Sequence, residues 1–156
     1  MSDPHVRVLS AGDHADVLNL LQELSGDIPV AASHAEFAAL LAHPGTSMIG
    51  AERAGQIVAM ATLHILPNLT QSGRPYGLVE NVVTLSAARK QGYGRAVMAA
   101  VISRADAAGC YKIMLLTGSA AAVGFYERLG FDGGEKHGMI IRRGPKRADT
   151  TMKKSQ

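Results

Sequence analysis

Apolar and polar positions along the chain recur with two periods. Short stretches alternate as strands do, and longer stretches repeat every three to four residues as amphipathic helices do. Strands are predicted over Val6–Leu9, Ser47–Arg53, Gln56–Leu66, Tyr76–Leu85, Ile113–Leu116 and Lys136–Arg142. Helices are predicted over Asp13–Leu24, from Ser33 to His43, and over Tyr93–Ala108 and Ala120–Leu129. This order indicates an α+β domain built on one mixed sheet.

Local signals mark several boundaries of these elements. Ser33 and Glu36 have the spacing of a capping box, which starts a helix. Ala54-Gly55 predicts a tight turn between two strands. Pro67–Pro75 is expected to be a polar loop, and Ile113–Leu116 a short buried strand.

Length and composition predict an ordinary globular protein. The 156 residues suit one domain, expected over residues 1–145, followed by a basic and disordered tail over residues 146–156. Cys110 is the only cysteine, so an internal disulfide cannot form. Since the N-terminus also lacks a signal-like segment, we expect a cytoplasmic protein. No apolar run approaches the ~20 residues that cross a bilayer, so no membrane partner is expected.

Charge and histidine spacing exclude two other classes of partner. The formal net charge is +3, and much of the excess lies in the tail, which has no interleaved aromatic residues. We therefore expect no nucleic-acid partner. The 6 histidines show no metal-ligand spacing, so no metal site is expected.

A glycine-containing loop stands between a predicted strand and a predicted helix. It comprises Arg89, Lys90, Gln91, Gly92, Tyr93, Gly94 and Arg95. The two glycines let the backbone turn tightly and approach a ligand, because they carry no Cβ atom. The helix that follows directs unpaired N–H groups and its positive dipole end at the loop. Together with the three cationic side chains, these features predict a phosphate cradle.

Other glycine loops fit this segment less well. A dinucleotide fingerprint needs Gly or Ala three residues after Gly94, where this chain has Val97. A P-loop needs Gly-Lys-Ser/Thr, which is absent. A purely structural turn remains an alternative when the loop is considered alone.

Three motifs in order resemble the GNAT acetyltransferase family. Arg89-x-x-Gly92-x-Gly94 is similar to its pyrophosphate-binding signature, Glu80–Thr84 to its splayed fourth strand, and Phe125–Phe131 to its F-Y-x-x-x-G-F segment. The resemblance implies acetyl-CoA as acetyl donor, with residues 89–95 holding its pyrophosphate. It also implies a mostly antiparallel mixed sheet of about seven strands with about four helices, and a homodimer. The backbone of Val82, Val83 and Thr84 would bind the pantetheine arm, and an N–H near Val82 would stabilise the oxyanion.

Within this family, Gly109–Ile113 and Val123–Glu127 resemble segments of glucosamine-6-phosphate N-acetyltransferases. Two positions depart from that pattern. Leu116-Thr117 stands where those enzymes carry an Asp, and Ala122 where they carry an Asn. The Asp bears on the sugar, so the acceptor cannot be named from the resemblance.

Two side chains are candidates for the chemistry. Glu80 lies in an otherwise apolar strand, where a carboxylate is costly unless it is paired or used, so it is our candidate general base. The alternatives are a Glu paired with an Arg, or an exposed one. By resemblance, Tyr126 is the candidate general acid for the CoA thiolate; its alternative is a core tyrosine packed with Phe125 and Leu129.

The sequence thus predicts an N-acetyltransferase that moves acetyl to a primary amine of a small molecule by direct attack in a ternary complex. One alternative is acetylation of a protein or peptide amine. Another is a CoA-binding module without catalysis, which would need neither candidate side chain.

Overall fold

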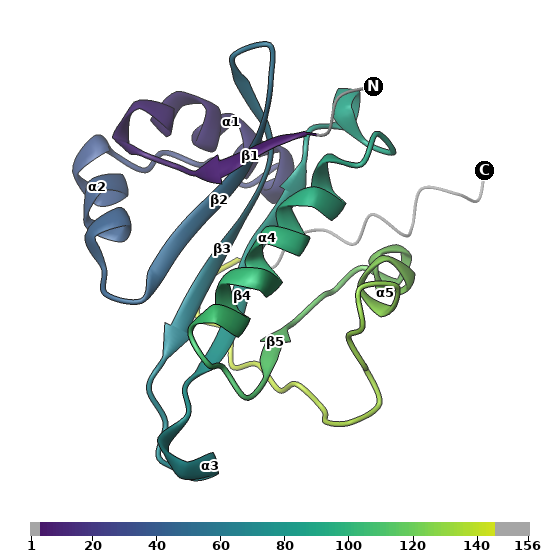
Figure 1. Ribbon diagram of the computed structural model, residues 1–156. Helices are drawn as coiled ribbons and strands as arrows, with labels where there is room; N and C mark the ends of the chain where they lie inside the picture. Colours follow the sequence, from purple (N-terminus) through teal and green to yellow (C-terminus); the bar gives the residue numbers. More distant parts are fainter. Residues whose placement is uncertain (1–3, 146–156) are drawn as a thin grey trace.

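The computed structural model describes residues 4–145, and the predicted basic tail lies outside them. Its five strands are β1 (His5–Val8), β2 (Thr46–Arg53), β3 (Gln56–Leu66), β4 (Tyr76–Thr84) and β5 (Ile113–Leu115). Its five helices are α1 (His14–Ser25), α2 (His34–Ala42), α3 (Thr70–Gly73), α4 (Tyr93–Ala107) and α5 (Ala120–Glu127). The strands form one sheet in sequence order, antiparallel from β1 to β4 and parallel between β4 and β5. Figure 1 shows the short β5 diverging from the long strands.

The α+β class and the mixed sheet are confirmed, but the expected numbers of elements are wrong. Residues 4–145 form five strands, not about seven, and five helices, not about four. The additional helix α3 lies in the predicted loop Pro67–Pro75, and Gln71 and Ser72 within it have left-handed backbone angles. It is therefore a tight turn more than a regular helix.

The strand expected over Lys136–Arg142 is also wrong. This segment is irregular, and its apolar side chains are exposed: Met139 by 93%, Ile140 by 61% and Ile141 by 81%. A run of apolar residues favours a strand only when a neighbouring strand pairs with it. Within the described residues, no strand pairs with this segment, although β5 lies at the edge of the sheet and is open on its outer side.

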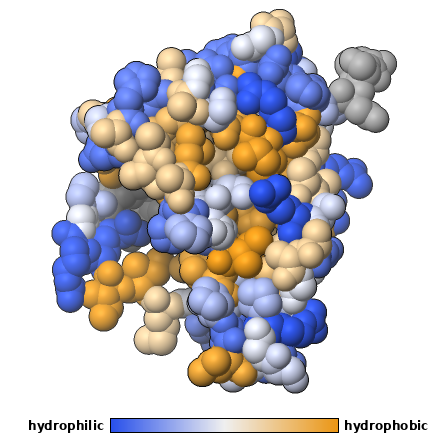
Figure 2. Space-filling view, turned by 60° about the vertical axis from the view of Figure 1, so that its left-hand side comes forward, coloured by the Kyte–Doolittle hydropathy of each residue, from blue (hydrophilic) through white to orange (hydrophobic). Residues whose placement is uncertain are grey.

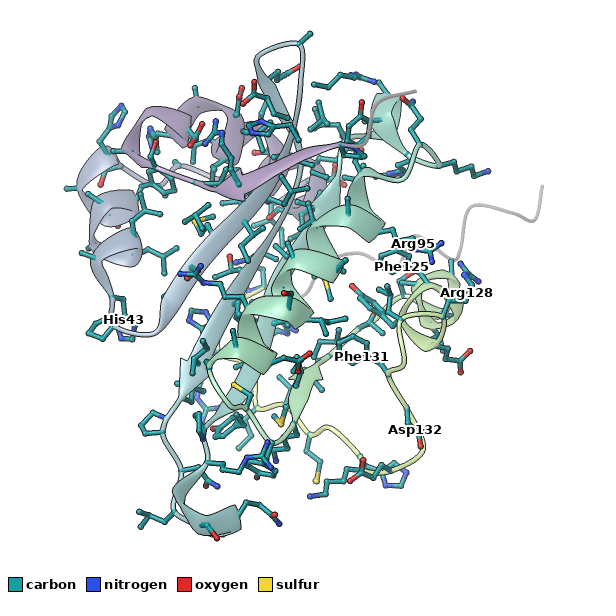
Figure 3. The ribbon with its side chains drawn as sticks, in the orientation of Figure 1. His43, Arg95, Phe125, Arg128, Phe131 and Asp132 are labelled. Atoms are coloured by element: carbon teal, nitrogen blue, oxygen red, sulfur yellow. The ribbon has the colours of Figure 1, made fainter. Side chains whose placement is uncertain are left out.

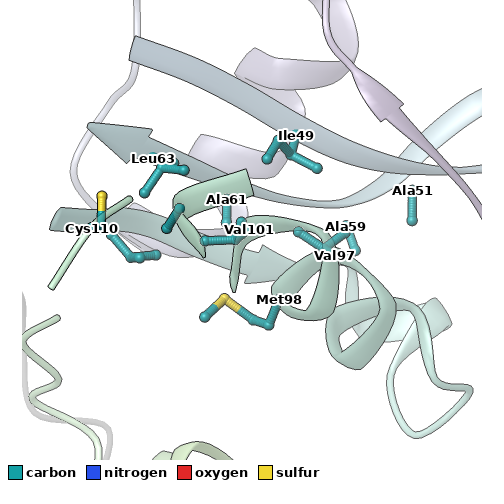
Figure 4. Close-up of a cluster of buried hydrophobic side chains, with 11 residues drawn as sticks. Ile49, Ala51, Ala59, Ala61, Leu63, Val97, Met98, Val101 and Cys110 are labelled. Atoms are coloured by element: carbon teal, nitrogen blue, oxygen red, sulfur yellow. The ribbon is translucent and has the colours of Figure 1, made fainter. Parts of the chain in front are cut away.

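Helices cover both faces of the sheet, so the domain has two hydrophobic cores, one on each face. On one face, α4 packs Val97, Met98 and Val101 against small and branched residues of β2 and β3 (Figure 4). On the other face, α1 and α2 bury Leu20 and Phe37 against residues that include Met48 and Met60. Figure 2 shows apolar side chains that also reach the surface between polar ones. The central strands are thus buried on both sides and hold a fixed framework.

Two structures that short-range signals in the sequence predicted are present. In the capping box, Ser33 N donates to Glu36 Oε2 at 2.7 Å, and Glu36 N donates to Ser33 Oγ at 3.2 Å. Ala54 and Gly55 both have positive φ, +50° and +81°, as a two-residue hairpin turn of this kind requires. By contrast, Ile113–Leu116 is not buried, because Met114 and Leu116 are 40% and 55% exposed at the edge of the sheet.

Candidate active site

The strand β4 is paired on both sides only in its first half. Gly77, Leu78 and Val79 pair with β5, and these are the only β4–β5 partners that the described residues make. Beyond this point β4 runs on for five residues, Glu80–Thr84, with no β5 partner. We call this side of residues 80–84 the open edge of β4. The backbone groups that point to this side face a potential ligand, as the predicted splayed strand requires, except the Thr84 carbonyl, which accepts from Arg89 Nε at 3.1 Å.

A β-bulge interrupts β4 at the start of the open edge. Met60 pairs with Val83 and Thr62 with Glu80, so Asn81 and Val82 together oppose one residue of β3. Asn81 has a φ of +54°, which Asn tolerates better than most side chains. The bulge shifts the alternation: Val82 packs on the α4 side, whereas Val83 packs on the side of α1 and α2. Bulges commonly redirect backbone and side-chain groups next to active sites.

The open edge ends at the glycine loop and the start of α4. Lys90 and Gly92 have left-handed φ values of +59° and +89°, which turn the chain sharply into the helix. Gly92 is the N-cap and has no side chain that could cap the helix. The first N–H groups of α4 therefore face outward, where the helix dipole favours an anion. This geometry supports the predicted phosphate cradle.

Gly94 lies where all three sequence motifs meet. A Cβ atom on Gly94 would stand 3.0 Å from Thr84 Oγ1 and 3.9 Å from Phe125 Cζ. The end of β4, the loop and the Phe125–Phe131 segment, which are far apart in sequence, are thus in direct contact. Figure 3 shows Arg95, Phe125 and Arg128 gathered where α4 begins and α5 passes. Only glycine fits at this position without displacing a neighbour.

The cationic side chains of the loop differ in their partners. Arg89 donates to Glu23 Oε1 at 2.8 Å, an ion pair with α1, and to the Thr84 carbonyl at 3.1 Å. Its charge is therefore partly compensated, and it also fixes the loop to the end of β4. Lys90 and Arg95 are exposed. These two side chains carry the positive charge that is most accessible to a phosphate.

Arg53 is a residue of this region that the sequence analysis missed. It lies at the end of β2, with its Nη1 3.3 Å from the Ala87 carbonyl oxygen and 3.4 Å from Gln91 Oε1. Its guanidinium stands 5.9 Å from the ring centre of Tyr93, within cation–π range. A contact across 38 residues of sequence leaves no local signal. The position of the β2–β3 hairpin in the folded chain brings Arg53 to the loop.

Glu80 projects from the beginning of the open edge toward the side of α1 and α2. It pairs with Thr62, which shares its face, whereas Val79 packs on the α4 side as alternation predicts. Glu80 is exposed, so the desolvation cost that suggested its role does not apply. Among residues 4–145 it forms no ion pair, which removes the alternative of a Glu paired with an Arg. Its role in catalysis remains a hypothesis.

Tyr126 lies on the other side of the open edge. Its ring packs edge-on against Phe125 and Phe131, with centroids 5.1 Å and 6.0 Å away. Burial raises the pKa of the Tyr126 hydroxyl, which keeps it protonated at neutral pH and able to donate. Tyr126 belongs to the cluster on the α4 side, so the structure does not bring it into contact with Glu80.

The residues of this region fit two parts of acetyl-CoA: the pyrophosphate and the pantetheine arm, which carries the amides. The fit rests on the outward N–H groups of α4, on the close approach at Gly94 that a Cβ would obstruct, and on the side of residues 80–84 that has no β5 partner. The first feature suits a pyrophosphate, and the last suits the amides of a pantetheine arm.

Three other observations on the described residues concern features outside this site. Within residues 4–145, no three His, Cys, Asp or Glu side chains gather as metal ligands. None of the helices in the same range has the length and apolar character of a bilayer span. A shallow hollow lies between β1, β2 and α4 and includes Ile49 and Ser103. It lies away from the glycine loop and contains no residue of the three motifs.

Comparisons with known proteins agree with this geometry. Residues 15–131 match the model of the acetyltransferase (GNAT) family. A glucosamine 6-phosphate N-acetyltransferase of Trypanosoma brucei brucei is 33% identical over 137 residues, which cover 86% of this chain and 92% of that protein. The solved structure of a candidate acetyltransferase from Agrobacterium tumefaciens str. C58 is 45% identical with a TM-score of 0.85, over 89% of this chain and 99% of that one.

A glucosamine-6-phosphate N-acetyltransferase from Arabidopsis thaliana shares the fold, with a TM-score of 0.81 at 21% identity over 92% of this chain and all of that one. The family match covers most of the domain, and the trypanosomal relative extends across nearly the same length. The chain therefore belongs to the GNAT acetyltransferase family and is an acetyltransferase. The family uses acetyl-CoA as its acetyl donor.

Proposed function

We propose that this enzyme transfers acetyl from acetyl-CoA to a primary amine of a small molecule, by direct attack in a ternary complex. The observation that carries the proposal is the open edge of β4, which leads from Glu80 to the N-terminus of α4. One continuous surface thus offers backbone hydrogen bonds along its length and an anion site at its end. Glu80 stands at the opposite end from the anion site, where the reacting group would lie.

The loop and the strand have separate tasks in binding the donor. Residues 89–95 hold the pyrophosphate, with N–H groups from the loop and the first turn of α4 and charge from Lys90 and Arg95. The backbone of Val82, Val83 and Thr84 pairs with the amides of the pantetheine arm. The five residues 80–84 span roughly 13 Å between their ends, at about 3.3 Å per residue. This length lets the strand orient the thioester before the amine arrives.

Glu80 acts on the acceptor. A protonated amine has no lone pair, so it must lose a proton before it attacks the thioester carbonyl. The Glu80 carboxylate accepts that proton, directly or through a water. A backbone N–H near Val82 donates to the carbonyl oxygen as it gains negative charge. Such donors commonly contribute several kcal/mol in a transition state.

Tyr126 acts on the leaving group. Its hydroxyl donates a proton to the departing thiolate of CoA and keeps the thiolate from attacking the product. The support is its place beside Phe125, which contacts Gly94 in the pyrophosphate-binding turn, and a raised pKa that keeps the hydroxyl protonated.

The acceptor to test first is glucosamine 6-phosphate, because the trypanosomal relative is named for it. We do not assign this sugar to the chain, since Leu116-Thr117 replaces the Asp of that group and Ala122 its Asn. A protein or peptide amine is the alternative acceptor.

The proposal is tested by thiol release from acetyl-CoA with a panel of glucosamine 6-phosphate, glucosamine, a polyamine and a lysine-containing peptide. We expect turnover with a small amine. In Glu80→Gln, kcat/KM should fall about 10²-fold or more at neutral pH, with CoA affinity unchanged. Glu135→Gln, which changes another exposed carboxylate, is the matched control and should keep full activity. Turnover with the peptide alone would favour the alternative acceptor, and CoA binding without turnover of any of these amines would refute every acceptor in the panel.

We also propose that two copies associate in the cytoplasm. The support is that β5 has no second partner strand within residues 4–145, together with the exposed apolar segment Met139–Ile141. An unpaired edge and an unpaired extended segment on one chain can satisfy each other in a symmetric pair. Light scattering should then give twice the 16.4 kDa mass of the chain, and a mass of one chain would refute this arrangement.

A further inference from the structure

Thr62 lies in the centre of the sheet with an unsatisfied hydroxyl. Its exposed fraction is 0%, and its Oγ1 is the one buried side-chain nitrogen or oxygen in residues 4–145 that has no hydrogen-bond partner. A buried hydroxyl without a partner destabilises a fold, because it has lost its bonds to water. Such a group in a central strand is unexpected unless a partner reaches it in another state of the enzyme.

The neighbours of Thr62 on its own face of the sheet identify that partner. Across the strands it pairs with Met48 of β2 and with Glu80 of β4. Along β3, the next residues on this face are Met60 and His64. The two methionines offer only weak sulfur acceptors. Among these sheet neighbours, one imidazole and one carboxylate could bind the hydroxyl.

The imidazole is already occupied on the side that faces away from β4. His64 Nδ1 lies 2.9 Å from Thr46 Oγ1 of β2, and Thr46 Oγ1 is in turn 3.0 Å from His43 Nδ1. These bonds turn the ring of His64 toward β2, whereas Glu80 lies on β4. Among the sheet neighbours of Thr62, the Glu80 carboxylate is therefore the remaining strong acceptor.

We propose that Thr62 is a positioning residue for Glu80. When the acceptor amine is bound, the Glu80 side chain folds back over β3 and the Thr62 hydroxyl donates a hydrogen bond to one carboxylate oxygen. Directly paired residues have Cβ atoms about 4.5–5.5 Å apart, so the carboxylate of a flexible Glu reaches the hydroxyl without backbone movement. The second oxygen then faces the amine in one orientation. This inference rests on the proposed role of Glu80 as base.

The hydroxyl changes the catalytic step by restricting an exposed and mobile carboxylate. A base that samples many rotamers spends little time in line with the proton it accepts, and fixing one rotamer raises that fraction. Once the amine is bound, the bond to Glu80 satisfies the Thr62 hydroxyl, and this gain favours the inward rotamer over the others. Thr62 itself does not touch the acceptor, because its side chain is fully covered.

The test uses three variants of the full chain. Thr62→Val removes the hydroxyl at nearly constant shape, so the midpoint of thermal unfolding should rise. Its kcat should fall about tenfold with the KM for acetyl-CoA unchanged, since a hydrogen bond to a charged group has about that effect. Thr62→Ser keeps a hydroxyl and should restore most of the rate. Thr62→Ala, which removes the hydroxyl and leaves a smaller side chain, should lose the same factor in kcat if Thr62→Val does not fold.

A double-mutant cycle with Glu80→Gln separates this inference from the proposed function. We expect Thr62→Val to have no further effect on kcat in the Glu80→Gln background, because the residue through which it acts is gone. Suppose that Glu80→Gln is slow. If Thr62→Val then keeps full kcat, or lowers kcat by the same factor with Glu80 and with Gln at position 80, the positioning role of Thr62 is refuted and the proposed role of Glu80 is not. If Glu80→Gln itself keeps full activity, the proposed base is wrong, and the role of Thr62 is refuted with it.

Discussion

Replacing Gly94 with alanine tests whether the close packing of the three motifs around this residue is needed to bind CoA. The added Cβ would stand 3.0 Å from Thr84 Oγ1, so Thr84 or the first turn of α4 must shift by a few tenths of an ångström. Overpacking of this kind costs about 1–3 kcal/mol. Alanine in place of glycine inside a helix returns about 1 kcal/mol. The free energy of unfolding should therefore fall by no more than about 2 kcal/mol, and the protein should remain folded.

Binding of CoA should respond more strongly than stability. A displaced first turn no longer presents its N–H groups at the distances a pyrophosphate requires, and a loss of about 1.4 kcal/mol weakens binding tenfold. We expect the Kd for CoA, measured by calorimetry, to rise about tenfold in Gly94→Ala. Adding Thr84→Ala removes the clashing oxygen and should restore most of the affinity.

Gly12→Ala is the matched control, since its Cβ would meet only Ser10 Oγ at 3.9 Å and lies far from the loop. It should bind CoA as the unmodified protein does. A folded Gly94→Ala protein with unchanged affinity would refute the argument from close approach. Failure of Thr84→Ala to restore affinity would show that the clash with Thr84 is not the cause.

Two further outcomes follow from single side chains. Tyr126→Phe should lower kcat on the order of 10²-fold with little change in CoA affinity, and equal activity would count against a general acid. Asp13 accepts from Arg7 at 2.8 and 2.9 Å and from Ser10 N at 2.7 Å, and the Arg7 guanidinium lowers the Asp13 pKa from 3.8 to about 2. A lowered carboxyl pKa stabilises the fold above pH 4, and that contribution is lost as the pH falls from about 4 to about 2. Urea unfolding should show that Asp13→Asn loses about 2 kcal/mol at pH 7 and has a shallower pH dependence in that window.

Local signals in the sequence predicted what depends on neighbouring residues. The capping box at Ser33, the turn at Ala54-Gly55 and the loop around Gly92 each require particular residue types at fixed spacing. They formed as expected because little else in the fold competes with them. The two faces of the sheet were likewise indicated by the spacing of apolar residues.

Features that depend on distant pairing could not be predicted. The segment Lys136–Arg142 has the composition of a strand, but pairing decides whether a strand forms. The contact of Arg53 with Gln91 and the pairing of Thr62 with Glu80 arise from register, which a bulge at Asn81 shifts by one residue. The exposure of Glu80 follows from the same geometry, and the sequence alone suggested a costly, buried carboxylate.

A crystal structure of the enzyme with CoA tests the central claim most directly. We expect the pyrophosphate on the N–H groups of residues 92–95, the pantetheine amides paired with Val82–Thr84, and the thiol end next to Glu80. A pyrophosphate bound elsewhere, or a pantetheine arm that leaves the open edge of β4 unpaired, would contradict the account.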